Sequence, residues 1–229
     1  KARFLPKMAT GELMVANCIT EPEAGTGKDI NTRAEKKGDR WILNGHKWLI
    51  SVFPDLCPYF YVTFANTGDG ITCFGIEEGT KGLMLKPMKK MMGTLGPRHY
   101  NVIFKDCAVP EKNILGQMGS GLNVAFDILA LSRVSIAACC VGVAQKFLDL
   151  SIAHAKRRST FGKPLSKRQA IQWSLAEIGT EISAARLLYQ KAAWMYDKGM
   201  TFDLEASIAK LFSEEMVTRV SEKALRLHG

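Results

Sequence analysis

The sequence predicts an α+β protein, in which an antiparallel β-barrel or sandwich precedes a helical bundle. Between Met14 and about Pro110, short alternating or apolar runs are separated by Gly, Pro, Asn and Asp, as in all-β domains. After Gly119-Ser120-Gly121 the apolar residues recur at steps of three and four, which is helical spacing. The 229 residues, 47% of them hydrophobic, are enough to fill a sizeable core. We therefore expect a β domain over residues 1–116 and a helical domain over residues 117–229.

The β domain is expected to consist of short strands. Two segments, Lys36-Lys37-Gly38-Asp39 and Asn44-Gly45, indicate hairpin turns, because Gly and Asn tolerate the positive φ that such turns require. Residues Lys1–Pro6 show no helix start or strand context of their own. The predicted strands are Met14–Thr20, Ile30–Glu35, Trp41–Leu43, Lys47–Val52, Tyr59–Phe64, Ile71–Ile76, Leu83–Leu85 and Asn101–Phe104.

Three long helices are expected in the second domain, and the first of them covers residues 121–157. In the second helix, apolar side chains share one face and predict a bundle seam, and residues 203–227 repeat the pattern. Breaks are expected at Thr160–Ser166 and Lys198–Thr201, which contain Gly or Pro. The seam residues are Ile171, Leu175, Ile178, Ile182, Ala185, Tyr189 and Ala192 in the second helix and Ile208, Phe212, Met216, Val220 and Ala224 in the third.

Composition limits the partners without choosing one. The formal net charge of +9 suits nucleic acid, an anionic membrane surface or phosphate-bearing small molecules. The six cysteines lack the spacing of a metal site, and we expect reduced structural thiols. No apolar run reaches the roughly 20 residues that span a bilayer, so no membrane span is predicted.

Two segments far apart in the sequence carry the strongest functional signal. Ile19–Thr26 is a turn of small residues, which can bring backbone N–H groups close to a polar ligand. Lys156–Gly162 is a cationic cluster that ends in an aromatic residue and a glycine. A cofactor with a ring at one end and phosphates at the other would use both segments. The alternatives are an ordinary Pro-Gly turn and a solvated group of charges at a helix end.

Five motifs in order make the chain similar to the acyl-CoA dehydrogenase family, flavoproteins with an N-terminal helical domain, a middle β domain and a C-terminal four-helix domain. The resemblance implies that the N-terminal helical domain is not in this chain and that the fourth helix of the bundle is missing. The motifs are Leu5–Glu12, Thr20–Thr26, Asn44–Ser51, Phe104–Gly116, and Arg158 with Phe161-Gly162-Lys163, Leu165 and Gln169.

The resemblance implies an FAD site made of several segments. Ile19 and Thr20 would bond the pyrimidine edge of the flavin, and Thr26 would lie at the pyrophosphate. Leu49, Ile50 and Ser51 would lie against the isoalloxazine ring, with Ser51 near N5. In relatives, the residues matching Arg158, Phe161 and Gln169 reach the FAD of a neighbouring subunit, so a homodimer or homotetramer is expected. Arg226 stands where a further family motif usually has a glutamine, and Gly229 resembles the first glycine of that motif. These two residues complete the predicted cofactor residues.

The reaction that the resemblance implies is α,β-dehydrogenation of an acyl-CoA thioester, with electrons passing to an electron-transfer flavoprotein. The catalytic glutamate is expected after Gly229, so the given residues are expected to be inactive alone. A minority of relatives carry the base at the position of Ser132, and a serine cannot be that carboxylate. Thr26, Ser132 and Arg133 are expected to contact substrate; an Arg133–Asp127 ion pair is an equally supported alternative.

Other functions on the same fold stay open at this point. Some relatives are oxidases or reductases, and some DNA-associated members bind nucleic acid through a basic C-terminal region. The nucleic-acid interpretation is disfavoured, because the charges here are not interleaved with exposed aromatic residues along one helix. The location would be cytoplasmic in a prokaryote and the mitochondrial matrix in a eukaryote. The residues do not predict which acyl group is bound.

Overall fold

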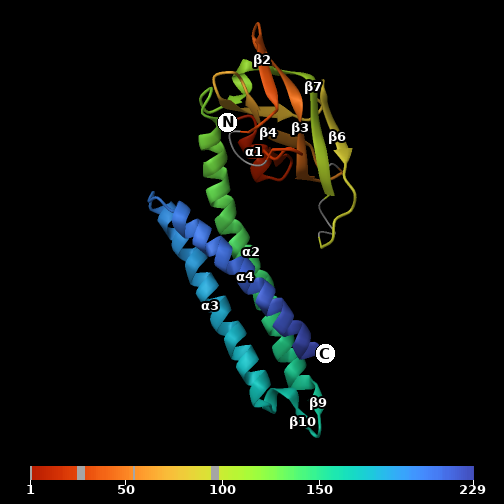
Figure 1. The fold of residues 1–229 in the computed structure, drawn as a ribbon, viewed down its shortest axis with the longest axis vertical. Coiled ribbons are helices and arrows are strands. Elements are labelled where there is room, and N and C mark those ends of the chain that lie inside the picture. Colours follow the sequence, from red (N-terminus) through yellow and green to blue (C-terminus); the bar gives the residue numbers. More distant parts are fainter. Residues whose placement is uncertain (1, 25–28, 54, 94–97) are drawn as a thin grey trace. The chain divides into compact units, whose positions relative to one another are not determined.

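A computed structural model describes residues 2–24, 29–53, 55–93 and 98–229 (Figure 1). The chain divides into two compact units, one ending at Phe126 and the other covering Asp127–Gly229. The first unit contains a β-sheet and the second is helical, which confirms the predicted α+β class. The exact boundary predicted between residues 116 and 117 stays a prediction.

The first unit is built on one mixed sheet. Within the described residues, its order is β6-β7-β3-β2-β4-β5-β8, and β1 pairs with β4 at the side of this path. The strands are β1 (Met14–Cys18), β2 (Arg33–Lys37), β3 (Arg40–Val52), β4 (Tyr59–Asn66), β5 (Ile71–Glu77), β6 (Leu83–Pro87), β7 (Arg98–Pro110) and β8 (Ile114–Leu115).

Most strand pairs are antiparallel, as predicted, but two are not. β3 and β7 form the longest antiparallel pair, and the β2–β3 hairpin turns at Gly38, which has a φ of 62°. β1 pairs with β4 in parallel, and β2 meets β4 in parallel at a single residue pair. A parallel pair requires a crossover connection, and the segment carrying β2 and β3 supplies it between β1 and β4.

Asn44-Gly45 does not form the predicted hairpin turn, because β3 continues through it. A Cβ atom placed on Gly45 would lie 2.3 Å from Thr32 Oγ1. The pairing of β3 with β7 shifts register between Leu43 and Gly45. The glycine therefore allows the backbone of β3 to lie close to Thr32 at an irregularity of the strand. The sequence alone does not distinguish such a glycine from one in a turn.

A short helix, α1 (Leu5–Ala9), lies where the sequence indicated neither helix nor strand. Pro6 falls at its first turn, where proline is favoured because its fixed φ suits the helix and its missing N–H has no partner there anyway. The prediction for these residues is therefore wrong, because a proline is compatible with the first turn of a helix.

The core of the first unit lies on the inner faces of the long strands. Leu43, Tyr61, Phe74, Val102 and Val109 are fully or almost fully buried in one cluster. Burial of such side chains contributes about 1.5–3 kcal/mol each. This packing fixes β3 and β7, the strands that carry the site discussed below.

The second unit consists of three long helices running side by side (Figure 1). They are α2 (Gly121–Arg157), which begins in the first unit, α3 (Gln169–Asp197) and α4 (Asp203–His228). A small hairpin of β9 (Ser159–Thr160) and β10 (Lys163–Pro164) connects α2 to α3.

The predicted seam of α3 is confirmed, and that of α4 is confirmed in part. Met216 and Val220 are buried against α3 residues such as Ile182, but Ile208 is 44% exposed. A step of four residues advances about 400° around a helix, so a stripe built only of such steps drifts about 40° per step off the seam. Small residues, beginning with Ala206, take the buried positions in the first turns.

The first long helix, α2, is strongly apolar. In α2, a window of 18 residues has a mean hydropathy of 1.9, so this helix is long and apolar enough to cross a membrane by length and composition. The expectation that no segment spans a membrane stays a prediction. α2 also packs through Val141 and Ala144 into the core of the second unit, and a bundle core favours the same composition.

Candidate cofactor site

A bulge in β3 is the centre of the candidate site. Lys47 pairs with Val102 of β7 and Ile50 pairs with Tyr100, so Trp48 and Leu49 together oppose a single residue. Leu49 adopts a φ of 58°, which is unusual for a residue with a Cβ and costs roughly 1–2 kcal/mol. Such bulges and strained residues are frequent at ligand sites.

The loop after β1 is bonded directly to this bulge. The backbone N–H of Trp48 donates to the carbonyl oxygen of Thr20, at 2.8 Å. The ammonium group of Lys47 donates to the carbonyl oxygen of Ile19, at 3.2 Å. Two predicted cofactor segments, separated in sequence, are thus brought to one place.

The predicted residues at this place offer both apolar and polar groups. Ile19 and Ile50 are buried, Thr20 and Leu49 are half-buried, and Ser51 is exposed. Within the described residues, the hydroxyl groups of Thr20 and Ser51 make no hydrogen bond to another residue. Thr26, predicted at the pyrophosphate, lies outside the described residues.

A buried ion pair lies directly behind these segments. Lys47 Nζ is 2.8 Å from Glu21 Oε1, and the two side chains are 0% and 3% exposed. Glu21 also accepts hydrogen bonds from the backbone N–H groups of Asn31 (2.7 Å) and Thr32 (3.0 Å) and from the Thr32 hydroxyl (2.5 Å). Each oxygen of the carboxylate is therefore partnered.

Both groups of this pair have altered pKa values. Burial lowers the pKa of Lys47, although Glu21 opposes that effect. Burial alone would raise the pKa of Glu21, but the hydrogen bonds from Lys47 and Thr32 outweigh it and hold the pKa below its usual value. Glu21 is thus a carboxylate at neutral pH.

A second group of predicted residues lies at one end of the second unit. Phe161, at the tip of the β9–β10 hairpin, is 97% exposed and has a φ of 51°. Arg158 and Gln169 are exposed at the end of α2 and the start of α3. The backbone N–H of Leu165 donates to the Arg158 carbonyl, at 2.8 Å, and closes the connection between the two helices.

The end of α4 lies close to the same region. The rings of His228 and His154 lie with their centres 4.4 Å apart and their planes tilted by 34°, which brings the last turn of α4 to the last turn of α2. Arg226 and Gly229 are exposed on this last turn or just after it. The predicted cofactor residues of the second unit therefore gather at one end of it.

The two predicted substrate residues that the structure describes, Ser132 and Arg133, lie on α2. Ser132 and Arg133 are half-buried on adjacent positions of the helix. Within the described chain, Arg133 forms no ion pair with Asp127, so that alternative is not supported. Contact of either residue with substrate stays a prediction.

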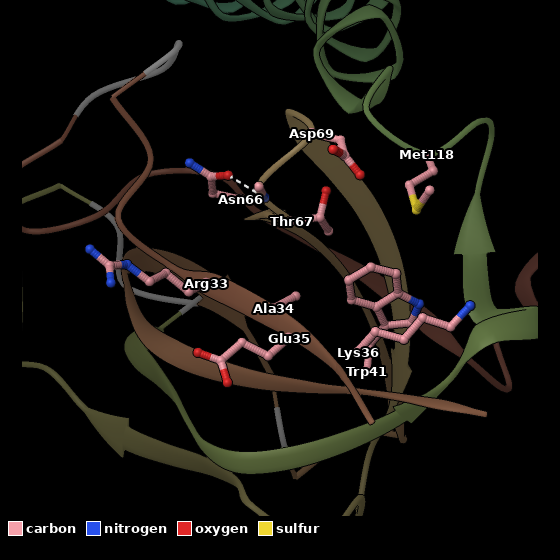
Figure 2. A pocket seen from close by; sticks show the side chains of 10 residues that line it. Arg33, Ala34, Glu35, Lys36, Trp41, Asn66, Thr67, Asp69 and Met118 are labelled. Carbon is pink, nitrogen blue, oxygen red and sulfur yellow. Dashed lines mark hydrogen bonds between the residues drawn. The ribbon is translucent and has the colours of Figure 1, made fainter. Parts of the chain in front are cut away.

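One groove of the first unit is lined by none of the predicted cofactor residues that the structure describes. It has a volume of about 670 Å³ and lies beside β2 and the β4–β5 turn (Figure 2). Trp41 forms part of its wall, with Lys36 Nζ 6.0 Å from the ring centre, and Met118 faces it from another segment. The groove is therefore separate from the candidate cofactor site.

Comparison with known proteins identifies the family. Residues 16–107 match the middle domain of acyl-CoA dehydrogenases, and residues 119–229 match their C-terminal domain. The chain belongs to the acyl-CoA dehydrogenase family. It is 35% identical to 3-(aryl)acrylate reductase from Clostridium sporogenes, over 100% of this chain and 62% of that protein. It is 36% identical to the mitochondrial short-chain specific acyl-CoA dehydrogenase of Homo sapiens, over 93% of this chain and 53% of that protein.

Solved structures of acyl-CoA dehydrogenase type agree with this fold. Butyryl-CoA dehydrogenase from Megasphaera elsdenii matches with a TM-score of 0.91 and 34% identity, over 99% of this chain and 61% of that one. A chain from work on the electron transferring flavoprotein of Acidaminococcus fermentans matches with a TM-score of 0.93 and 32% identity, also over 99% and 61%. This chain thus spans about three fifths of these structures.

The acyl-CoA dehydrogenase motifs did not reveal every residue that builds the site. Lys47 belongs to a motif, but it also lies in the alternating register of the buried residues Trp41 and Leu43, and a lysine at such a position is a signal of a buried, paired charge. Thr32 and Arg168 carried no signal, because their roles depend on partners that the fold brings near.

Proposed function

We propose that the protein is an FAD-dependent oxidoreductase that introduces an α,β double bond into an acyl-CoA thioester. The observation that carries this proposal is the Trp48–Thr20 hydrogen bond, since it joins the two segments that the family motifs assign to the flavin ring. Membership of the acyl-CoA dehydrogenase family supports the reaction class. This chain would supply much of the cofactor site.

The residues at the β3 bulge suit a flavin ring. The backbone of Ile19 and the hydroxyl of Thr20 would bond its pyrimidine edge, and Leu49 and Ile50 would lie against the ring. Ser51 would place its hydroxyl near N5, and Thr26 would hold the pyrophosphate. When bound, FAD supplies the acceptor for the hydride that leaves the β-carbon.

The residues at the end of the second unit suit the cofactor of a neighbouring subunit. Arg158 would bond its phosphates, because a guanidinium group donates to two oxygens at once. Phe161 is almost fully exposed, which suits a side chain that packs on another molecule. Gln169, Arg226 and Gly229 would complete the contact. A homodimer or homotetramer follows from this arrangement.

The substrate would be an acyl-CoA, with Ser132, Arg133 and Thr26 in contact with it. A carboxylate outside residues 1–229 would take the α-proton. An electron-transfer flavoprotein would accept the electrons. The protein would act in the cytoplasm of a prokaryote or in the mitochondrial matrix of a eukaryote.

A reductase is the second candidate, because one relative at 35% identity is a 3-(aryl)acrylate reductase. The same cofactor site would serve both directions, since hydride transfer between substrate and flavin is reversible in principle. An oxidase would differ in the reaction of the reduced flavin with oxygen.

Anaerobic spectroscopy of the purified full-length protein tests these proposals. We expect visible flavin absorption bands that an acyl-CoA from a panel of chain lengths bleaches. Bleaching only by an external reductant, with recovery on addition of an enoyl thioester or an acrylate, would favour the reductase. Fast recovery in air after bleaching would favour the oxidase. A colourless protein that takes up no FAD would overturn all three.

A further inference from the structure

We propose that the side chain of Lys47, together with Glu21 and Thr32, is the positioning element that holds the loop after β1 against the β3 bulge. This inference rests on the proposed function, because these two segments are the ones assigned to the flavin ring. None of the three side chains is expected to touch the cofactor. They would act by fixing the distance between the groups that do.

The ammonium group of Lys47 bridges the two segments. It belongs to the last paired residue before the bulge, and it donates both to Ile19 O (3.2 Å) and to Glu21 Oε1 (2.8 Å). Ile19 and Glu21 flank Thr20, whose carbonyl accepts the bond from Trp48 (2.8 Å). In the described chain, these three bonds are the hydrogen bonds between residues 19–21 and 47–51.

A third segment, residues 31–32, holds the Glu21 carboxylate in place. The carboxylate of Glu21 accepts three hydrogen bonds from Asn31 and Thr32, which directly precede β2. Gly45 leaves the space that Thr32 fills, since a Cβ there would overlap the threonine side chain. The bridge is therefore anchored at the loop, at β2 and at β3.

Burial distinguishes this pair from the surface ion pairs of the chain. Lys47 and Glu21 are 0% and 3% exposed, whereas Lys36 and Glu111 are 49% and 50% exposed at the same separation of 2.8 Å. A buried charge requires its partner, so the two side chains have little freedom to move apart. Such a bridge fixes geometry, which a solvated pair does not.

The test compares full-length wild type with Lys47→Met, Thr32→Val and the surface control Lys36→Met. Met keeps the length of the side chain but removes the donor, and Val keeps the shape of Thr while removing one bond to Glu21. For each protein, we would measure FAD affinity by fluorescence, the visible flavin spectrum at saturating FAD, and urea unfolding of the apoprotein. Thr32→Val keeps the test informative if Lys47→Met does not fold.

We expect FAD affinity to fall about tenfold to hundredfold in Lys47→Met, because this is the effect of losing one charge-assisted hydrogen bond. The fall should be smaller in Thr32→Val. The flavin spectrum at saturating FAD should shift in both Lys47→Met and Thr32→Val. In Lys36→Met, neither the FAD affinity nor the spectrum should change. Lower stability with unchanged affinity and spectrum would overturn the positioning role and leave a structural ion pair. A wild type that binds no FAD would instead overturn the proposed function.

Discussion

The guanidinium group of Arg168 lies over the ring of Phe161, with its carbon 5.5 Å from the ring centre. The same group donates to the carbonyl oxygen of Thr160 (2.6 Å) and to its hydroxyl (3.0 Å). Arg168 therefore braces the β9–β10 hairpin from the start of α3. The hairpin presents Phe161 at a positive φ, and this brace offsets part of its strain.

Replacement of this arginine should weaken FAD binding without unfolding the helical unit. In Arg168→Ala, the hairpin loses two hydrogen bonds and a cation–π contact, and we expect FAD affinity to fall about tenfold. Fluorescence titration of the apoprotein measures this. Lys167→Ala, at the exposed neighbouring position, is the control and should bind FAD as wild type does. Equal affinities for the two variants would contradict the role of Arg168.

The fold was largely predictable from the spacing of apolar residues, because short alternating runs mark the strands of the first unit and steps of three and four mark the helices of the second. The seam of α3 and the hairpin at Gly38 follow from local rules, and the structure confirms both. The turn predicted at Asn44-Gly45 is absent, because such a pair suits either a hairpin turn or a close approach to a neighbouring residue, and only the packing against Thr32 decides between them. Local patterns thus predict elements better than they predict irregularities within them.

The candidate site was predictable where motifs mark it and not where tertiary contacts build it. Ile19, Thr20 and Leu49 belong to motifs, and the structure brings them together through backbone bonds. The anchoring of Lys47 by Glu21 depends on residues 26 apart in sequence that meet only after the sheet forms. The sequence carries no measure of that distance.

The glycine in β3 gives a direct test of the close approach. Gly45→Ala would place a Cβ 2.3 Å from Thr32 Oγ1, so β2 or β3 must shift. We expect a loss of about 1–3 kcal/mol in the free energy of unfolding, as overpacking of a core costs. Gly142→Ala is the matched control, because nothing lies within 4 Å of its Cβ position on α2. This control should be neutral or more stable by up to about 1 kcal/mol.

The two variants would be compared by urea unfolding at one pH. A stability of Gly45→Ala equal to that of wild type would show that the strand tolerates the extra methyl group. Reduced stability of Gly142→Ala as well would mean that the loss in Gly45→Ala is not specific to the contact with Thr32.

Thiol reactivity should follow burial. Burial raises the pKa of Cys18 and of Cys73 to about 12 and that of Cys107 to about 11, so their reactive thiolate forms are scarce at neutral pH. Cys139 is exposed in the chain. With iodoacetamide at neutral pH, we expect modification of Cys139 and none of the three buried thiols until urea unfolds the protein. Peptide mass spectrometry locates the label, and early modification of Cys73 would contradict the packed sheet.

The charge of Glu21 should make the free energy of unfolding depend on pH. Its folded pKa lies below the usual 4.5, because hydrogen bonds from Lys47 and Thr32 outweigh the opposing effect of burial. The folded state then binds fewer protons than the unfolded state, so the stabilisation is present above the unfolded pKa. It is lost as the pH falls through the folded pKa.

The loss of stability in Glu21→Gln should therefore be greatest at neutral pH. We expect the variant to unfold with about 3 kcal/mol less free energy than wild type there, since Lys47 is left buried and unpaired. The difference should shrink once the pH falls below 4.5 and the wild-type carboxyl protonates. Urea unfolding across this pH range measures it, with Glu111→Gln at an exposed ion pair as the control that should change little. A gap that stays constant down to acid pH would mean that the amide disturbs packing rather than removes a charge.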